Sequence, residues 1–324
     1  MTQPTVTISR RAALLGAGAA TLAAGSGFTL TSASAMTEMK GVAELPYARF
    51  KLGSFEVTTL LDGAVNGSDP QKTFGMNVDA DTFASASSEN FIPADAFRAF
   101  FTPTLINTGK ELVLFDTGSG AGAQPARGNI ASAIESAGYT ADQIDIVVLT
   151  HMHPDHIGGI MTNGAPTFPN ARYIAGSIEY NFWSGMDPEA NGVTKLVASG
   201  VTPMADKMTF LDDGGSVVSG ITAMSAFGHT PGHMAYQIES DGQRLIVAAD
   251  AANHYVWSLA KPDWEVRFDA DKAAAAETRR KLFGMIASEK IPFIGYHMPF
   301  PSLGYVEAMG DGFRYVPATY QLRL

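Results

Sequence analysis

The stretch LTHMHPDHIGG, residues 149–159, holds the side chains of this chain that are best suited to chemistry. It contains three of the seven histidines of the 324-residue chain, together with Asp155, a proline and two glycines. Imidazole nitrogens and carboxylate oxygens are ligands for divalent transition metals. No requirement of packing or helix capping explains this set of residues, so the block indicates a metal site.

The spacing within the block indicates two metal positions. His151 and His153 come at the end of IDIVVLT, an apolar run typical of a strand buried on both faces. Residues two apart in an extended chain face the same side, so both imidazoles are able to face one ion. Pro154 then bends the chain, and Asp155 and His156 follow in the first turn of a predicted helix, from which they project toward a second position. Each ion needs further ligands from elsewhere in the chain.

The other candidate ligands follow predicted strands, with His254 as the exception. His229 and His233 lie in GHTPGH after the strand ITAMSAF, Asp250 ends RLIVAAD, and His297 ends IPFIGYH. Sheets of α/β proteins present their binding sites at the carboxyl ends of strands. Spacing alone does not decide which histidine of GHTPGH is a ligand.

The elements that would position these residues form two similar halves. Antiparallel runs of strands alternate with helices, which predicts an α/β fold: an αββα sandwich of two mixed β-sheets with helices on the outer faces. The clearest helix is ADKAAAAETRRKLFGMIASEK, with Asp269 or Asp271 as its N-cap. Residues 64–100 are polar and irregular, and they are interpreted as a lid or rim segment with room for short helices.

Residues 1–35 are predicted to be a twin-arginine signal peptide. Arg10 and Arg11 precede a weakly apolar run rich in alanine and glycine, which ends at the small-residue cleavage pattern 33–35. A membrane anchor is the alternative, but the run is short and glycine-rich for a spanning helix. We therefore expect a single domain over residues 36–324, located in the periplasm and without stable membrane association after cleavage.

The composition limits the partners and the metal. The formal charge is −10, and the two arginines of the predicted signal make the remainder still more acidic, which argues against nucleic acid as a partner. A small-molecule substrate is expected, and a homodimer stays open. The chain has no cysteine, so a metal would be held by nitrogen and oxygen alone. Two divalent ions are expected, with Zn²⁺ the best match and manganese, cobalt or iron as alternatives.

The motifs together resemble those of the metallo-β-lactamase fold hydrolases. THMHPDH, FDTG at 115–118, GHTPGH, Asp250 and His297 occur in that family's order over almost the whole predicted mature chain. The exported branch that includes methyl parathion hydrolase is the most similar, through HMHPDH, Trp183 in NFW, GHTPGH and the late segment GFRYVP.

This resemblance implies roles for individual residues. One metal would be held by His151, His153 and His229, and the other by Asp155, His156 and His297. Asp250 would bridge the two ions, and Asp155 and Asp250 would be the catalytic carboxylates. Asp116 and His233 would support the ligands from behind. The expected substrate pocket contains Phe182, Trp183, Asn253 and Tyr255. Lactonases of this fold have a tyrosine where this chain has Asn253, so their proton donor is not matched.

The implied function is hydrolysis by a dinuclear metal centre, in which a metal-bridging hydroxide attacks an ester, lactone or phosphotriester. No G-x-S-x-G motif offers a serine nucleophile instead. Two alternatives remain open: an iron-dependent sulfur or thiol oxidoreductase with the same ligands, and a non-catalytic zinc-binding protein.

Overall fold

The computed structural model describes residues 38–39 and 41–323. The predicted signal peptide therefore lies outside the described residues. Glu44–Leu324 form one compact unit, and the segment Met1–Ala43 divides from it; the described residues of that segment contain no helix or strand. Within the part of the chain that the structure describes, no helix has the length and apolarity needed to cross a membrane.

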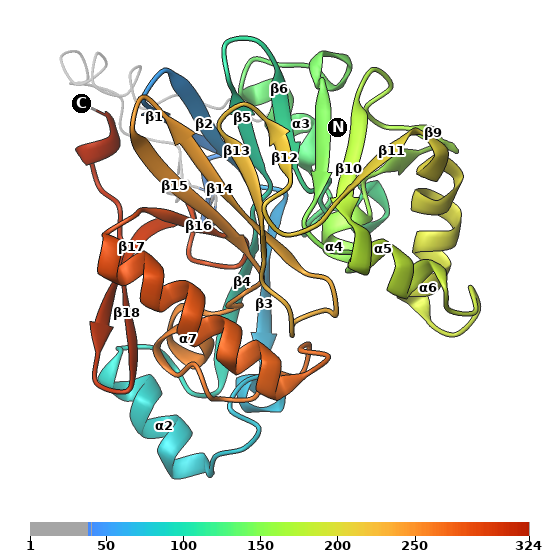
Figure 1. Ribbon diagram of the computed structural model, residues 1–324. Coiled ribbons are helices and arrows are strands. Elements are labelled where there is room, and N and C mark those ends of the chain that lie inside the picture. The colour runs from blue at the N-terminus through green and yellow to red at the C-terminus, as the bar shows by residue number, and fades with distance from the viewer. Residues whose placement is uncertain (1–37, 40, 324) are drawn as a thin grey trace, which may run out of the picture. The chain divides into compact units, whose positions relative to one another are not determined.

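The first of two large sheets has seven strands in the order β1-β2-β5-β6-β7-β10-β11 (Figure 1). Their bounds are β1 Tyr47–Leu52, β2 Phe55–Leu60, β5 Thr104–Asn107, β6 Leu112–Phe115, β7 Ile146–Leu149, β10 Arg172–Gly176 and β11 Met208–Leu211. The strands from β1 to β6 pair antiparallel, and those from β6 to β11 pair parallel. The parallel strands carry the crossover helices, so their carboxyl ends share one edge.

The second sheet also has seven strands, in the simple sequential order from β12 to β18. Their bounds are β12 Ser216–Val218, β13 Ile221–Ser225, β14 Met234–Ser240, β15 Gln243–Ala249, β16 Phe293–Gly295, β17 Leu303–Met309 and β18 Gly312–Pro317. All pairs are antiparallel except β15 with β16, which are parallel. Both sheets are therefore mixed, as predicted.

Alternation along the strands explains why the two sheets pack face to face. In β7, Ile146 and Val148 belong to the apolar core shared with the second sheet, where they join residues such as Val247. Val147 and Leu149 point the other way, into a second core under the helices. Every residue of β7 is buried, because a strand with a layer on each face needs apolar side chains at both parities.

Helices cover the outer faces of the sandwich (Figure 1). The first sheet is flanked by α3 Ile130–Ser136, α4 Pro154–Ile157, α5 Ser177–Ser184 and α6 Gly192–Leu196, and the second by α7 Lys272–Glu289. Asp271 is the N-cap of α7 and accepts a hydrogen bond from the amide of Ala274. The predicted αββα sandwich is confirmed.

Residues 64–100 are more regular than the sequence suggested. β3 (Gly63–Ser68) and β4 (Ala96–Phe101) form a hairpin, and α2 (Ala80–Glu89) lies in the connection between them. A π-helical turn, η6 (Tyr255–Ala260), holds α2 in place, since Trp257 stacks on Phe83 and donates its indole N–H to Ser87 at 2.9 Å. The sequence left room for a short helix, which is α2, but the interpretation of the rest as irregular was wrong because β3 carries few of the apolar residues that mark a strand. A further short hairpin consists of β8 Met161–Thr162 and β9 Ala165–Pro166.

Candidate metal centre

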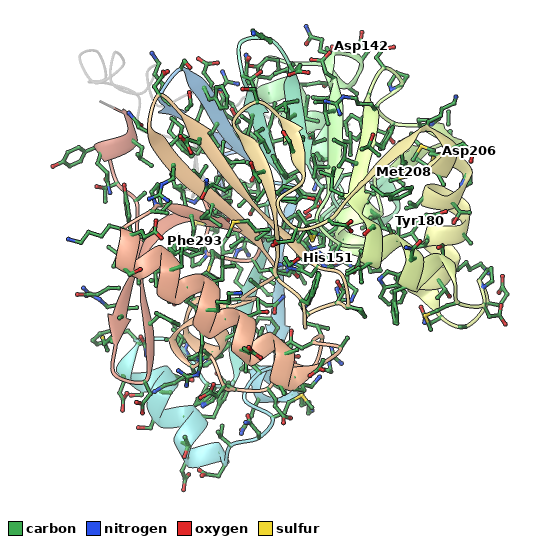
Figure 2. The ribbon with its side chains drawn as sticks, viewed as in Figure 1. Asp142, His151, Tyr180, Asp206, Met208 and Phe293 are labelled. Carbon is green, nitrogen blue, oxygen red and sulfur yellow. The ribbon has the colours of Figure 1, made fainter. Side chains whose placement is uncertain are left out.

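Loops from both sheets bring the sequence-predicted ligands together. The HMHPDH block follows β7 of the first sheet and runs into α4. His229 follows β13, Asp250 follows β15, and His297 follows β16 of the second sheet. His151 consequently lies in the interior, next to loops of the second sheet (Figure 2). The carboxyl ends of strands in two sheets thus meet at one place.

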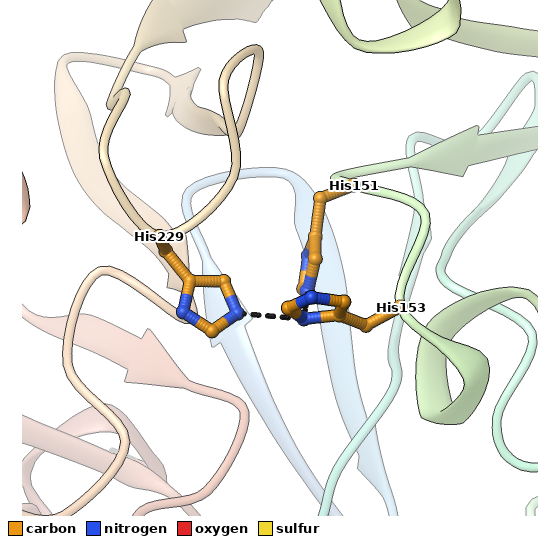
Figure 3. A group of neighbouring side chains, drawn as sticks. All are labelled: His151, His153 and His229. Carbon is orange, nitrogen blue, oxygen red and sulfur yellow. Dashed lines mark hydrogen bonds between the residues drawn. The ribbon is translucent and has the colours of Figure 1, made fainter. Parts of the chain in front are cut away.

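Three imidazoles point at a common position (Figure 3). Nδ1 of His153 lies 3.1 Å from Nε2 of His151 and 2.9 Å from Nε2 of His229. His151 and His229 are buried, and His153 is partly exposed. Burial lowers the pKa of His153 to about 3 and holds the pKa of His151 well below its usual range. Both rings therefore stay neutral, which is the form that binds a metal.

A second group consists of Asp155, His156 and His297. The Oδ2 atom of Asp155 lies 3.5 Å from Nε2 of His156 and 3.3 Å from Nε2 of His297. His156 is fully buried, whereas Asp155 and His297 reach the surface. The structure thus brings these three predicted ligands together.

Asp250 lies between the two groups and contacts both. Its Oδ2 is 3.3 Å from Nε2 of His229 in the first group and 3.2 Å from Nε2 of His297 in the second. Its Oδ1 is 3.4 Å from Nε2 of His156. Burial opposes ionisation of this carboxyl, but His297 and His156 outweigh burial and hold the pKa of Asp250 well below its usual range. The carboxylate thus contacts nitrogens of both groups.

The chemistry of the cluster fits metal ions. Nε2 of His156 and Oδ1 of Asp250 are buried, and neither has a hydrogen-bond partner among the described residues. A buried polar atom without a partner costs about 1–3 kcal/mol, and an ion between these atoms would remove that cost. The donors are nitrogen and oxygen alone, which suits zinc and its neighbours in the first transition row.

Two candidate histidine ligands are oriented by hydrogen bonds at Nδ1, the ring nitrogen that does not face the other candidate ligands. Asp116 accepts hydrogen bonds from Nδ1 of His156 and from the backbone and hydroxyl of Thr150, each at 2.8 Å. Nδ1 of His297 donates to the carbonyl of Phe100 at 2.7 Å. Such partners fix which nitrogen of a histidine faces the metal. Asp116 is therefore hydrogen-bonded to the candidate ligand His156 and to Thr150, which precedes His151.

His233 holds the backbone of Asp250 and is not among the grouped candidate ligands. Its Nδ1 donates to the carbonyl of Ala226 at 3.0 Å, and its Nε2 accepts the amide N–H of Asp250 at 3.1 Å. With both nitrogens engaged, burial lowers the pKa of His233 to about 3. Of the two histidines in GHTPGH, it is His229 that points at the other candidate ligands.

One supporting residue was missed by the sequence analysis. Asp269 accepts a hydrogen bond from Nδ1 of His229 at 3.0 Å and forms an ion pair with Arg279 at 2.8 Å. The sequence suggested only a capping role for Asp269, and Asp271 has that role instead. Arg279 is fully buried and also donates to the carbonyls of Pro262 and Trp264. No local sequence signal distinguishes Asp269 from Asp271.

The loops at the site are strained and closely packed. Asp116 has φ 64°, and Ala249, which precedes Asp250, has φ 44°. Such values are costly for residues other than glycine. In the HMHPDH loop, a side chain at Gly159 would overlap the carbonyl oxygen of Thr117. Glycine is therefore required at 159 for this close approach of the backbone.

The expected pocket residues take different positions. The Trp183 ring lies 6.3 Å from that of His153, and Phe182 is 41% exposed and packs edge-on against Trp183. Asn253 donates its amide N–H to Oδ2 of Asp250 at 2.9 Å. The ring of Tyr255 contacts those of His254 and Tyr315, within the aromatic packing around η6. Trp183 and Asn253 are thus adjacent to the cluster.

Comparison with known proteins agrees with this geometry. A model of the metallo-beta-lactamase superfamily matches residues 102–287. The solved structure of AidC, described as a dizinc quorum-quenching lactonase with a bound product, is 26% identical, with a TM-score of 0.78 over 85% of this chain and 98% of AidC. AbOPH, described as a hydrolase in the beta lactamase superfamily, is also 26% identical, with a TM-score of 0.78 over 87% of this chain and 100% of AbOPH.

A probable metal-dependent hydrolase from Staphylococcus aureus shares the fold, with 20% identity and a TM-score of 0.69 over 83% of this chain and 98% of that chain. A search of the curated proteins found no match.

Proposed function

Because the chain belongs to the metallo-beta-lactamase superfamily and is a metal-dependent hydrolase of that fold, we propose that it hydrolyses lactones and related esters at a centre of two divalent ions. Zinc is the proposed native metal. The substrate would be a small molecule that approaches from the open side of Asp155 and His297, the candidate ligands that reach the surface.

One observation carries this proposal: two sets of three candidate ligands share a single carboxylate. His151, His153 and His229 would hold one ion, and Asp155, His156 and His297 the other. Asp250 lies within 3.4 Å of nitrogens from both sets. A protein that only stored zinc would not need a second ligand set that shares a carboxylate with the first and is open to solvent.

Two bound divalent ions would supply a water of lowered pKa and would polarise the acyl carbonyl. Hydrolysis adds the oxygen of water to the carbonyl carbon, breaks the ring C–O bond and delivers a proton to the leaving oxygen. Asp155 is the more exposed of the two carboxylates in the cluster, at 18% against 3% for Asp250. We assign it the transfer of this proton. Asp250 keeps its orientation through the Asn253 amide and the His233 ring.

A lactone or ester is favoured by two features. The similarity to AidC extends over 98% of that lactonase. The Trp183 and Phe182 rings lie side by side on the His153 side of the cluster, where they offer an apolar wall for the acyl part of a substrate.

Metal analysis of the purified protein, combined with a substrate panel, tests the proposal. The panel contains lactones followed by acid release, aryl esters, phosphotriesters and a chromogenic β-lactam. We expect two equivalents of metal and the highest kcat/KM on a lactone or ester, with Asp250→Ala inactive. Full activity in Asp250→Ala would contradict the two-metal mechanism, and preference for a phosphotriester would overturn the proposed substrate class.

The same preparations address the other two functions considered. Bound iron together with oxygen consumption in the presence of a thiol would favour an oxidoreductase. Tightly bound zinc without turnover of any substrate in the panel would favour a zinc-binding protein.

A further inference from the structure

Glu179 is a buried carboxylate that the proposed reaction does not use. It lies in the first turn of α5 and has no solvent exposure. Burying a carboxylate is costly unless hydrogen bonds compensate for the lost water. Burial raises the pKa of Glu179, and hydrogen bonds from Thr230, Met152, Trp183 and Gly232 act in the opposite direction.

Those hydrogen bonds join the two loops that carry the first set of candidate ligands. Oε1 accepts the amide N–H of Met152 at 2.9 Å, and Met152 stands between His151 and His153. Oε2 accepts hydrogen bonds from the hydroxyl of Thr230 at 2.7 Å and from the amide N–H of Gly232 at 2.9 Å. Thr230 is the residue directly after His229. One side chain therefore spans the two sheets just behind these three histidines.

The fourth hydrogen bond reaches the pocket wall. Trp183, one turn further along α5, donates its indole N–H to Oε1 at 2.8 Å. The ring so fixed lies 6.3 Å from that of His153. The backbones at Gly232 and Glu179 are closely packed, since a side chain at Gly232 would overlap the backbone of Glu179.

We propose that Glu179 is a positioning residue that couples the His151, His153 and His229 metal position to the Trp183 wall of the substrate pocket. The inference rests on the proposed metal centre. Its consequence is that a change at Glu179 alters the affinity for one of two ions and the recognition of substrate together. The ion held by Asp155, His156 and His297 should be unaffected, because Glu179 makes no described hydrogen bond to that set.

Glu179→Gln is the sharpest test, because it keeps the shape and replaces one accepting oxygen by an amide nitrogen. That nitrogen must face at least one N–H group that can only donate, whichever way the amide is turned: Met152 and Trp183 at one oxygen position, Gly232 at the other. We expect chelator competition with Zn²⁺ to show about 10–100-fold weaker binding of one ion, the usual effect of losing a residue behind metal ligands. The KM for a lactone with a bulky acyl group should rise, and the visible spectrum of the cobalt-substituted protein should change.

Val197→Ala is the matched control for lost stability. Val197 is buried in the apolar cluster against which Trp183 packs, and its shortening leaves the hydrogen bonds of Glu179 in place. This variant should lower the free energy of unfolding without changing metal affinity, KM or the cobalt spectrum. If both variants move these readouts equally, Glu179 acts only through stability and the proposal is overturned.

Thr230→Val is the second test variant, used if Glu179→Gln does not fold. It removes one of the four hydrogen-bond donors to Glu179, so it should reduce the affinity for the same ion by a smaller factor than Glu179→Gln. Unchanged affinity would overturn the proposal. Two ions bound by wild type and by Glu179→Gln with equal affinities would overturn this inference alone. A wild-type protein that binds no divalent ion would overturn the proposed function as well.

Discussion

Asp269 accepts a hydrogen bond from the ring of His229 at 3.0 Å, across forty positions of sequence. It fixes the imidazole so that Nε2 faces His153 and Asp250. The ion pair with Arg279 in turn fixes the carboxylate. A histidine ligand whose outer nitrogen is held by a carboxylate is a recurrent feature of metal sites in proteins.

Asp269→Asn should therefore weaken the proposed centre. An amide at this position bonds the ring less strongly and leaves the buried Arg279 without its countercharge. We expect about a 10–100-fold loss in metal affinity or in kcat/KM, measured by chelator competition and by initial rates. Asp271→Asn is the matched control, because asparagine is also a good N-cap and should leave both quantities unchanged. Equal losses in the two variants would contradict the role of Asp269.

Glycine substitutions should have opposite effects at Gly159 and Gly284. A methyl group at Gly159 overlaps the carbonyl of Thr117, so Gly159→Ala should cost about 1–3 kcal/mol or more. At Gly284, within α7, no atom lies within 4 Å of the added methyl. Gly284→Ala should stabilise the protein by about 0.4–1 kcal/mol. Urea unfolding of both variants measures these differences, and a neutral Gly159→Ala would be inconsistent with the close approach.

The stability should depend on pH through His254. Its Nδ1 accepts the amide N–H groups of Val256 and Trp257, at 3.2 Å each, and burial lowers the pKa of His254 to about 3. A histidine whose pKa is lowered on folding contributes its full stability above the unfolded pKa of about 6.5 and loses it as the pH falls toward 3. Acidification should therefore reduce the free energy of unfolding.

His254→Asn separates this effect from titration of the metal site. Asparagine caps the turn but does not titrate, so this variant should lose less stability than wild type between about pH 7 and about pH 5. Titration of the candidate ligands is common to both proteins and cancels in the comparison. Equal losses, measured by urea unfolding at each pH, would contradict the prediction.

Removal of metal should destabilise the protein. Without ions, the buried Nε2 of His156 and Oδ1 of Asp250 have no hydrogen-bond partner among the described residues. An ion present at about 1,000 times its dissociation constant contributes about 4 kcal/mol. We expect a strong chelator to lower the melting temperature of wild type and to have less effect on Asp250→Ala. The same shift in both proteins would argue against Asp250 as a shared ligand.

The sequence was informative where the chemistry is local. The HMHPDH block contains ligand-type side chains that no packing or capping requirement explains, and long apolar runs mark strands such as β7 and β15, whose ends carry candidate ligands. The roles of Asp269 and Glu179 could not be predicted because most of their partners are distant in sequence. Asp269, which lies near a helix start, was interpreted as a possible N-cap. Strand β3 of the β3–β4 hairpin lacked an apolar pattern. The signal peptide, the periplasmic location and the oligomeric state stay predictions.

The division of the candidate ligands between the two sheets has a consequence for how the protein matures. Four candidate ligands follow β7 and three follow strands of the second sheet, the last of them His297 after β16. Neither half of the chain would hold both of the proposed ions by itself. Loading of both ions would therefore require that both sheets have formed and packed on each other, so a molecule with both proposed ions bound would be one whose folding has been completed.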